Sequence, residues 1–319
     1  MIVSATDLSK SYRHGKVRAL AGVDLEVNKG EIFGLIGPDG AGKTTLFRLL
    51  TTLIKPDGGT ASVDGLDIVR DYRALRRRIG YMPGRFSLYQ DLTVEENLRF
   101  FATIFHTTIE ENYDLVKDIY RQIEPFKHRR ASQLSGGMKQ KLALSCALIH
   151  APRVLFLDEP TTGVDPVSRS EFWQMLQTLR SRHGLSIIAS TPYMDEAMQC
   201  DRIALMQTGR FLDVDTPQGI IGRFTPTLWA VRSNQMHRLL GDLRDWQDTE
   251  SVFSFGDSQH MTVRNGASHE ALRQHLLARG HDQVDITVVT ASIEDVFITL
   301  LRQQPQLSGN PQASPPHEQ

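Results

Sequence analysis

An eight-residue stretch, GPDGAGKT at 37–44, constrains the fold of this 319-residue chain more than any other feature. It matches the pattern Gly-x-x-x-x-Gly-Lys-Ser/Thr, and it lies between an apolar segment, EIFGLIG, and a helical pattern, KTTLFRLLTTL. In that order of strand, glycine loop and helix, backbone N–H groups surround an anion at the helix N-terminus. The stretch therefore predicts a phosphate-binding loop in an α/β fold. The residues expected to line it are Gly37, Pro38, Asp39, Gly40, Ala41, Gly42, Lys43, Thr44 and Thr45.

A second apolar run, VLFLDEP at 154–160, ends in two acidic residues. Like LSIIAS further along, it is a continuous apolar run typical of a buried parallel strand. Its acidic end should therefore meet the phosphate loop at the carboxyl edge of the sheet. Lys43 would reach the β- and γ-phosphates, while Thr44 directly and Asp158 through water would hold magnesium. Glu159 would act as the general base that polarises the attacking water.

The stretch LSGGMKQ at 134–140 predicts a second helix start suited to an anion. Ser135 is a good N-cap, and Gly136 and Gly137 leave the first backbone N–H groups of the helix bare. A capped helix with a flexible entry and no ligand is the alternative interpretation of the segment taken alone.

With these motifs in this order, the chain resembles the ATP-binding subunits of ABC transporters. The resemblance covers about residues 2–222 and rests on GPDGAGKTT, LSGGMKQ, VLFLDEP and GVDP. It implies an α/β fold of the P-loop NTPase class, an ABC cassette with a parallel core sheet, an antiparallel N-terminal β-subdomain and a helical subdomain. It also implies ATP and magnesium as cofactors.

In that family two cassettes pack head to tail. The resemblance implies that Ser135, Gly136 and Gly137 bind the γ-phosphate held by the second cassette, and that Asp165 crosses the dimer interface. Asp165 is equally compatible with a plain role as N-cap of a helix beginning at Pro166. Tyr12 lies where the family places an aromatic residue that stacks on adenine, although a tyrosine in a hairpin also serves packing.

The chain departs from the family pattern at two positions. After GYMP the family usually has a glutamine, and here Gly84 stands in its place. Pro192 stands where the family usually has a histidine that contacts the γ-phosphate, and proline has no side-chain donor and no backbone N–H. We expect the hydroxyl of Thr191 or Ser190, at the same strand end, to substitute in part as a donor.

Three segments are predicted along the chain: the cassette at 2–223, a small α+β accessory domain at 224–302 and a disordered tail at 303–319. In the accessory domain TLWAVRS, HMTVRN and VDITVV indicate strands, and helical patterns occur around 269–279 and 292–302. The tail, QQPQLSGNPQASPPHEQ with Arg302 before it, is rich in Pro, Gln and Ser.

Composition narrows the classes of partner. Lys and Arg number 36 against 37 for Asp and Glu, so no basic field favours nucleic acid. Cys146 and Cys200 lack the spacing of a metal site or a disulfide framework. Without a leader or an apolar run of about 18 residues, we expect a cytoplasmic protein, bound to the inner face of the cell membrane through its partner.

The segments TTGVDPVSRSEFW, YMDEA and ASIEDVFITLL are similar to drug-export cassettes of the daunorubicin-resistance type. The resemblance implies an ATPase that powers an exporter by ATP-driven dimerisation, with itself or a related subunit, beneath integral membrane permease subunits. It also places the loop 84–92 against a short helix of the permease, with Phe86, Leu88 and Tyr89 as contact candidates or as local packing.

Two other functions remain open. The first is a regulatory cassette that binds ATP with little hydrolysis, which Gly84 and Pro192 favour. The second is a soluble ABC ATPase acting on ribosomes or DNA; those on ribosomes usually carry two cassettes and a charged linker in one chain.

Overall fold

The computed structural model describes residues 1–13, 15–85 and 87–303. The chain divides into two compact units, Met1–Ile220 and a second unit that begins at Ile221. Within the described ranges, no helix is long and apolar enough to cross a membrane.

An antiparallel sheet in the first unit contains four strands in the order β2-β1-β4-β5. Hydrophobic and polar residues alternate along them, so Ala5, Leu25 and Val63 are buried while their sequence neighbours reach the surface. This sheet is the antiparallel β-subdomain that the family resemblance implies. Its strands are β1 (Val3–Tyr12), β2 (Val17–Val27), β4 (Gly58–Val63) and β5 (Leu66–Asp67).

The central sheet has six strands in the order β10-β9-β3-β8-β7-β6. All its pairs are parallel except the edge pair of β9 with β10. Every residue of β3, β7 and β8 is buried, which is why these strands are continuous apolar runs. The strands are β3 (Ile32–Ile36), β6 (Ile79–Met82), β7 (Val154–Asp158), β8 (Ser186–Thr191), β9 (Arg202–Gln207) and β10 (Arg210–Asp215).

The register of this sheet brings three strand ends together. Ile36, the last residue of β3, pairs with Thr191, the last residue of β8. Ser190 in turn pairs with Asp158, the last residue of β7. The segments that follow the three strands therefore begin side by side at one edge, where α/β folds bind ligands.

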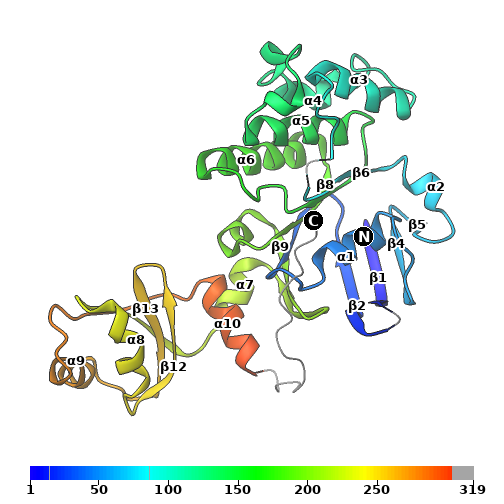
Figure 1. The fold of residues 1–319 in the computed structure, drawn as a ribbon. Coiled ribbons are helices and arrows are strands. Elements are labelled where there is room, and N and C mark those ends of the chain that lie inside the picture. Colours follow the sequence, from blue (N-terminus) through cyan, green and yellow to red (C-terminus); the bar gives the residue numbers. More distant parts are fainter. Residues whose placement is uncertain (14, 86, 304–319) are drawn as a thin grey trace. The chain divides into compact units, whose positions relative to one another are not determined.

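Helices complete the first unit, and α5 packs against α3, α4 and α6 to form the helical subdomain (Figure 1). The first turn of α3 forms a capping box: Thr93 Oγ1 accepts from the Glu96 N–H, and Glu96 Oε2 accepts from the Thr93 N–H. The helices, including short 3₁₀ turns η1–η3, are α1 (Lys43–Leu50), α2 (Tyr72–Leu75), α3 (Val94–Ile104), α4 (Tyr113–Tyr120), η1 (Glu124–Phe126), η2 (Ala131–Gln133), α5 (Gly136–Leu148), α6 (Pro166–His183), η3 (Met194–Gln199) and α7 (Pro217–Gly222).

The second unit is a four-stranded antiparallel sheet with strand order β12-β13-β11-β14 and its own hydrophobic core. Trp229, Met261, Leu239 and Leu272 belong to that core, so α8 and α9 pack on the same face of the sheet. Its elements are β11 (Thr227–Arg232), α8 (Met236–Arg244), β12 (Thr249–Phe255), β13 (Ser258–Val263), α9 (His269–Ala278), β14 (Asp285–Val288) and α10 (Ile293–Gln303). The predicted tail lies outside the described residues, except for Gln303, which ends α10.

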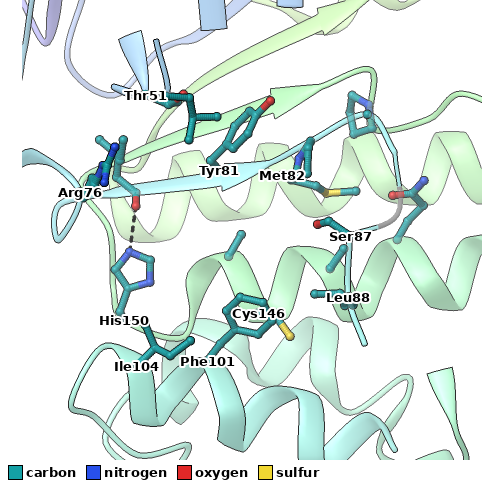
Figure 2. Close-up of a pocket in the computed structure, with 18 of the residues that line it drawn as sticks. Thr51, Arg76, Tyr81, Met82, Ser87, Leu88, Phe101, Ile104, Cys146 and His150 are labelled. Carbon is teal, nitrogen blue, oxygen red and sulfur yellow. Dashed lines mark hydrogen bonds between the residues drawn. The ribbon is translucent and has the colours of Figure 1, made fainter. Parts of the chain in front are cut away.

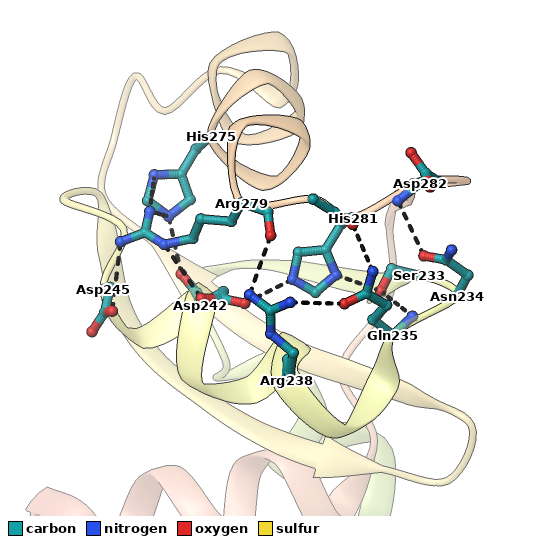
Figure 3. Close-up of polar contacts among 11 residues, drawn as sticks. Ser233, Asn234, Gln235, Arg238, Asp242, Asp245, His275, Arg279, His281 and Asp282 are labelled. Atoms are coloured by element: carbon teal, nitrogen blue, oxygen red, sulfur yellow. Dashed lines mark hydrogen bonds and ion pairs between the residues drawn. The ribbon is translucent and has the colours of Figure 1, made fainter.

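A polar network joins α8 to the segment after α9 in this unit (Figure 3). His281, which is fully buried, bonds through Nε2 to Asp242 Oδ2 at 2.8 Å and through Nδ1 to Ser233 Oγ at 2.8 Å. Arg279 Nε lies 3.3 Å from Asp242 Oδ1. The hydrogen bond with His281 lowers the pKa of Asp242 below its usual value, against a smaller opposing effect of burial.

Candidate nucleotide-binding site

The loop between β3 and α1 has glycine where no other residue fits. A Cβ on Gly37 would lie 2.2 Å from the Met206 carbonyl oxygen, and Gly42 combines a φ of 110° with a 2.6 Å approach to the Ala19 oxygen. The backbone is therefore held in a tight curl that begins α1. Such a curl presents N–H groups to an anion, as the motif predicts.

Lys43, the first residue of α1, has only 3% of its surface exposed. Its Nζ donates to the carbonyl oxygens of Gly37 at 2.7 Å and Pro38 at 3.1 Å, and lies 3.2 Å from Glu159 Oε1. The loop thus folds around the ammonium group and fixes it among the residues predicted to bind phosphate.

The two predicted magnesium ligands contact each other. Thr44 Oγ1 donates to Asp158 Oδ1 at 3.2 Å, and Ser190 Oγ donates to the same oxygen at 2.7 Å. A hydroxyl and a carboxylate are hard oxygen donors, which fit magnesium with water filling its remaining positions. In the part of the chain that the structure describes, no group of three or more His, Cys, Asp or Glu forms a metal centre.

Glu159 leaves β7 in a strained backbone conformation, with a φ of 49°. Its N–H donates to the backbone oxygen of Ser190 at 3.1 Å and to Ser190 Oγ at 3.0 Å. Ser190 therefore holds both acidic residues at once, since its hydroxyl accepts from Glu159 and donates to Asp158. The side chain of Glu159 remains 23% exposed, within reach of solvent.

Tyr12 lies next to α1, and its hydroxyl is 3.4 Å from Thr45 Oγ1. The ring is partly exposed at the end of β1. Stacking on a base from this position stays a prediction.

Ser135 caps α5, as predicted, by accepting a hydrogen bond from the Met138 N–H at 3.4 Å. The following glycines face the loop before α6: a Cβ on Gly137 would lie 2.8 Å from Ser168 Oγ, and a Cβ on Gly136 would lie 3.9 Å from the Gly163 oxygen. This segment belongs to the helical subdomain, whereas Lys43 and Thr44 belong to α1 beside the central sheet.

Asp165 acts as the N-cap of α6, with Oδ1 accepting from the Ser168 N–H at 3.0 Å. That bond lowers the pKa of Asp165, so its carboxylate stays ionised at the positive end of the helix. The capping role is confirmed, and contact across an interface stays a prediction.

Of the two residues that depart from the family pattern, Gly84 lies beside Glu159 and Pro192 follows the end of β8. A Cβ on Gly84 would be 3.0 Å from the Asp158 oxygen and 3.7 Å from Glu159 Cβ, so the chain passes this strand end closely. Pro192 directly follows β8, and Thr191, its neighbour, is fully buried.

The expectation that Thr191 or Ser190 supplies the missing donor is wrong. Thr191 Oγ1 donates to Glu196 Oε2 at 2.6 Å, while the Ser190 hydroxyl is engaged by Asp158 and Glu159. Glu196 was not anticipated as part of the site. The only sequence signal for it is an acidic residue on the buried side of YMDEA, next to the buried Ala197.

A largely apolar cavity of about 450 Å³ lies between β6 and the helices α3 and α5 (Figure 2). Leu88 lines it and is 8% exposed, whereas Ile104 on its rim is 51% exposed. Tyr89 beside it is 50% exposed, and Phe86 lies outside the described residues. Leu88 is therefore a local packing residue, whereas Tyr89, Ile104 and the cavity-lining Leu53, which is 53% exposed, are exposed.

His150 lines the same cavity and stacks on Phe105, with ring centroids 3.7 Å apart. Its Nε2 donates to the Ile79 oxygen at 2.9 Å, so Nδ1 is the unprotonated nitrogen of the ring. Burial lowers the pKa of His150 and keeps the ring neutral. Among the described residues, Nδ1 is a buried acceptor without a hydrogen-bond partner.

Comparison with known proteins places this site in a family. Residues 20–162 match the family model described as ABC transporter. The Nod factor export ATP-binding protein I of Rhizobium etli is 32% identical over 308 residues, which cover 93% of this chain and 92% of the relative. The chain belongs to the ABC transporter family. It is one of the ATP-binding cassettes of that family, as the motifs predict.

Other relatives carry drug-related names. The probable multidrug ABC transporter ATP-binding protein YbhF of Escherichia coli is 38% identical over 304 residues, 94% of this cassette and 52% of the relative. The cassette thus spans about half the length of that protein. Daunorubicin resistance ATP-binding protein DrrA2 of Streptomyces coeruleorubidus is 41% identical over 220 residues, 65% of each chain.

Solved structures confirm the predicted cassette fold. CbiO1 of Clostridium perfringens, part of the transporter complex cbiONQ, aligns with a TM-score of 0.63 at 28% identity, covering 70% of this chain and 91% of that one. A dimeric ATP-binding cassette in a post-hydrolysis state with ADP and Pi aligns with a TM-score of 0.60 at 26% identity, covering 67% and 98%.

Proposed function

We propose that this cassette is the ATP-hydrolysing subunit of an exporter, working as a dimer beneath separate membrane permease subunits. The observation that carries the proposal is the contact network at one sheet edge, in which Lys43 pairs with Glu159 and Thr44 bonds to Asp158. Phosphate binding, metal binding and a general base thereby meet in one place.

The proposed reaction is attack of water on the γ-phosphorus of ATP, which breaks the bond to the β-phosphate oxygen and releases ADP and phosphate. The backbone of residues 37–45 and Lys43 bind the phosphates. Thr44 and Asp158 would hold magnesium, which neutralises charge on the phosphate oxygens. Glu159 accepts the proton of the attacking water.

The ion pair between Lys43 and Glu159 gives this reaction an order of events. A phosphate that binds Lys43 draws the ammonium away from Glu159, because both anions compete for the same charge. The Glu159 carboxylate then becomes available to water. The strained φ and the two hydrogen bonds with Ser190 keep its backbone in place while this exchange occurs.

A second cassette completes the site in this proposal. Ser135, Gly136 and Gly137 form a helix start with bare N–H groups, and an ATP sandwiched between two cassettes would meet it from the other subunit. The exposed carboxylate of Asp165 would lie at the same interface. The dimeric cassette among the similar structures supports this arrangement.

The permease partner is proposed to dock at the cavity beside α3 with an apolar helix. Tyr89 and Ile104 are exposed apolar side chains at this place, which marks an interaction surface. The partnerless Nδ1 of His150 would accept a hydrogen bond from a donor side chain of that helix. The names of the relatives, which refer to multidrug transport, daunorubicin resistance and Nod factor export, support an exported cargo of one of these classes.

A regulatory cassette that binds ATP without turnover is the second candidate. It is favoured by Gly84 and Pro192, and by the engagement of the Thr191 hydroxyl with Glu196. The deciding measurement is magnesium-dependent ATP turnover of the purified cassette with its permease, compared with Glu159→Gln. Turnover no higher than that of the variant, with ATP still bound, would establish the regulatory function instead.

A further inference from the structure

Glu196 is a buried carboxylate that the proposed reaction does not use. It lies in η3, five residues after the end of β8, and only 3% of it is exposed. A buried charge is costly unless hydrogen bonds and an opposite charge compensate it. The partners of Glu196 therefore indicate why the chain keeps it there.

Three side chains donate to this carboxylate and satisfy both its oxygens. Thr161 Oγ1 lies 2.8 Å from Oε1 and 3.1 Å from Oε2, and Arg169 Nε lies 3.0 Å from Oε1. Thr191 Oγ1 donates to Oε2 at 2.6 Å. Thr161 and Thr191 are 1% and 0% exposed, so these bonds are shielded from water.

Each donor belongs to a segment that carries a candidate site residue. Thr161 follows Glu159 by two residues in the turn after β7. Arg169 lies in the first turn of α6, and its N–H bonds to the backbone oxygen of Asp165 at 2.9 Å. Thr191 ends β8 next to Pro192, so Glu196 ties all three segments together.

Arg169 has a second set of contacts that fixes the ion pair. Its guanidinium carbon lies 4.0 Å from the centre of the Tyr193 ring, and Nη2 reaches Asp195 at 3.2 Å. Burial is the largest single effect and opposes the charge of Arg169, but the attraction and hydrogen bonds of Glu196 and Asp195 together outweigh it and raise the pKa of Arg169. Arg169 therefore stays charged beside Glu196.

We propose that Glu196 is a positioning residue for ATP hydrolysis, and this rests on the proposed function of the cassette. Its carboxylate holds the turn after Glu159, the start of α6 after Asp165 and the end of β8 in one arrangement. In a chain whose Pro192 offers no donor, the placement of Glu159 depends on this buried link. Glu196 itself contacts no reacting atom.

Glu196→Gln tests the proposal because it keeps the shape of the side chain and removes its charge. One amide oxygen cannot accept from all three donors, and Arg169 loses its buried counter-charge. Small displacements of a catalytic group are costly, so kcat should fall by about 10- to 100-fold. KM for ATP and the Kd of magnesium-ATP should stay unchanged, because the phosphate loop is not involved.

Asp195→Asn is the matched control, since it removes the neighbouring, 76% exposed carboxylate from the same arginine. It should retain wild-type kcat and melting temperature. Thr191→Val removes one of the three donors and keeps the charge of Glu196. It should lower kcat as well, but by less than Glu196→Gln does. This variant keeps the proposal testable if Glu196→Gln does not fold.

The outcomes separate the two proposals. A wild-type kcat in Glu196→Gln and Thr191→Val, or an equal fall in Asp195→Asn, overturns the positioning role alone. A rise in KM or Kd that accounts for the whole loss also overturns it. If wild-type turnover is no higher than that of Glu159→Gln, the ATPase function fails, and the positioning role fails with it.

Discussion

At the scale of single residues, the ion pair of Lys43 with Glu159 joins the residue proposed to bind phosphate to the proposed general base. Lys43 is nearly buried, and such an ammonium without a counter-charge would be costly. Glu159 supplies that counter-charge at 3.2 Å. In the proposed reaction, the phosphate oxygens of ATP would compete with Glu159 for the same ammonium group.

Lys43→Ala should weaken magnesium-ATP binding by about 10- to 100-fold, because a charge-assisted hydrogen bond contributes roughly 1.5–3 kcal/mol. Calorimetry with magnesium-ATP measures the change. Lys55→Ala removes the same charge from an exposed position outside the loop and should leave affinity unaltered. Wild-type affinity in Lys43→Ala would exclude this loop as the nucleotide site.

Local motifs made most of the candidate site predictable from the sequence. Lys43, Thr44, Asp158 and Glu159 come from patterns whose spacing relates directly to strand ends, and the register of β3, β7 and β8 brings them together. The direction of the Thr191 side chain was not predictable, because it depends on Glu196 five residues later in a 3₁₀ turn. Side-chain networks between segments leave no periodic pattern in the sequence.

Amphipathic periodicity predicted the elements of the cassette more fully than those of the second unit. The strands β11, β13 and β14 and the helices α9 and α10 match the predicted segments. The helix α8 and the strand β12 were not predicted. Only Val252 in β12 is fully buried, so this edge strand lacks the alternation that identifies the others.

The contact of α8 with the segment after α9 gives the second unit a pH-dependent stability. The folded-state pKa of Asp242 lies below its usual value of 3.8, so its ionised form stabilises the fold above that pH. That contribution is lost as the pH falls through the lowered pKa. Asp242→Asn should therefore lower the free energy of unfolding at neutral pH, with the difference from wild type shrinking below pH 3.8.

Tryptophan fluorescence during urea unfolding measures this effect, because Trp229 and Trp246 lie in the core of the second unit. Asp282→Asn, which alters an exposed carboxylate near the same segment, should behave like wild type. A difference between Asp242→Asn and wild type that persists undiminished into acid would show that the network does not act through ionisation.

At the scale of the whole molecule, the proposed function requires the cassette to contact a permease and a second cassette. Tyr89→Asp and Ile104→Asp place charges on the exposed side chains beside the cavity. Each substitution should weaken association with the permease by about 2 kcal/mol or more, which is roughly a 30-fold rise in the Kd of the complex. ATP binding should stay intact. Co-purification and detergent-phase binding assays measure the association. Val69→Asp is the control, because Val69 is 40% exposed and lies outside the cavity. Unchanged association would place the permease contact elsewhere.

In the proposed dimer the two cassettes share two ATP sites, and Glu159→Gln separates dimerisation from hydrolysis. The amide cannot take a proton from water, so bound ATP persists, while the backbone and Thr44, Asp158 and Lys43 still bind the nucleotide. The substitution also removes the charge that competes with phosphate for Lys43 and so favours the nucleotide-bound form. A dimer should therefore accumulate when ATP is added to Glu159→Gln, seen as a doubled mass by light scattering, and no dimer should form with ADP.

Ser135→Glu in the same background places a negative charge at the helix start that is expected to face the second cassette's γ-phosphate. It should return the mass to that of a monomer. A Glu159→Gln cassette that stays monomeric at saturating magnesium-ATP, with and without its permease, would contradict the two-cassette site.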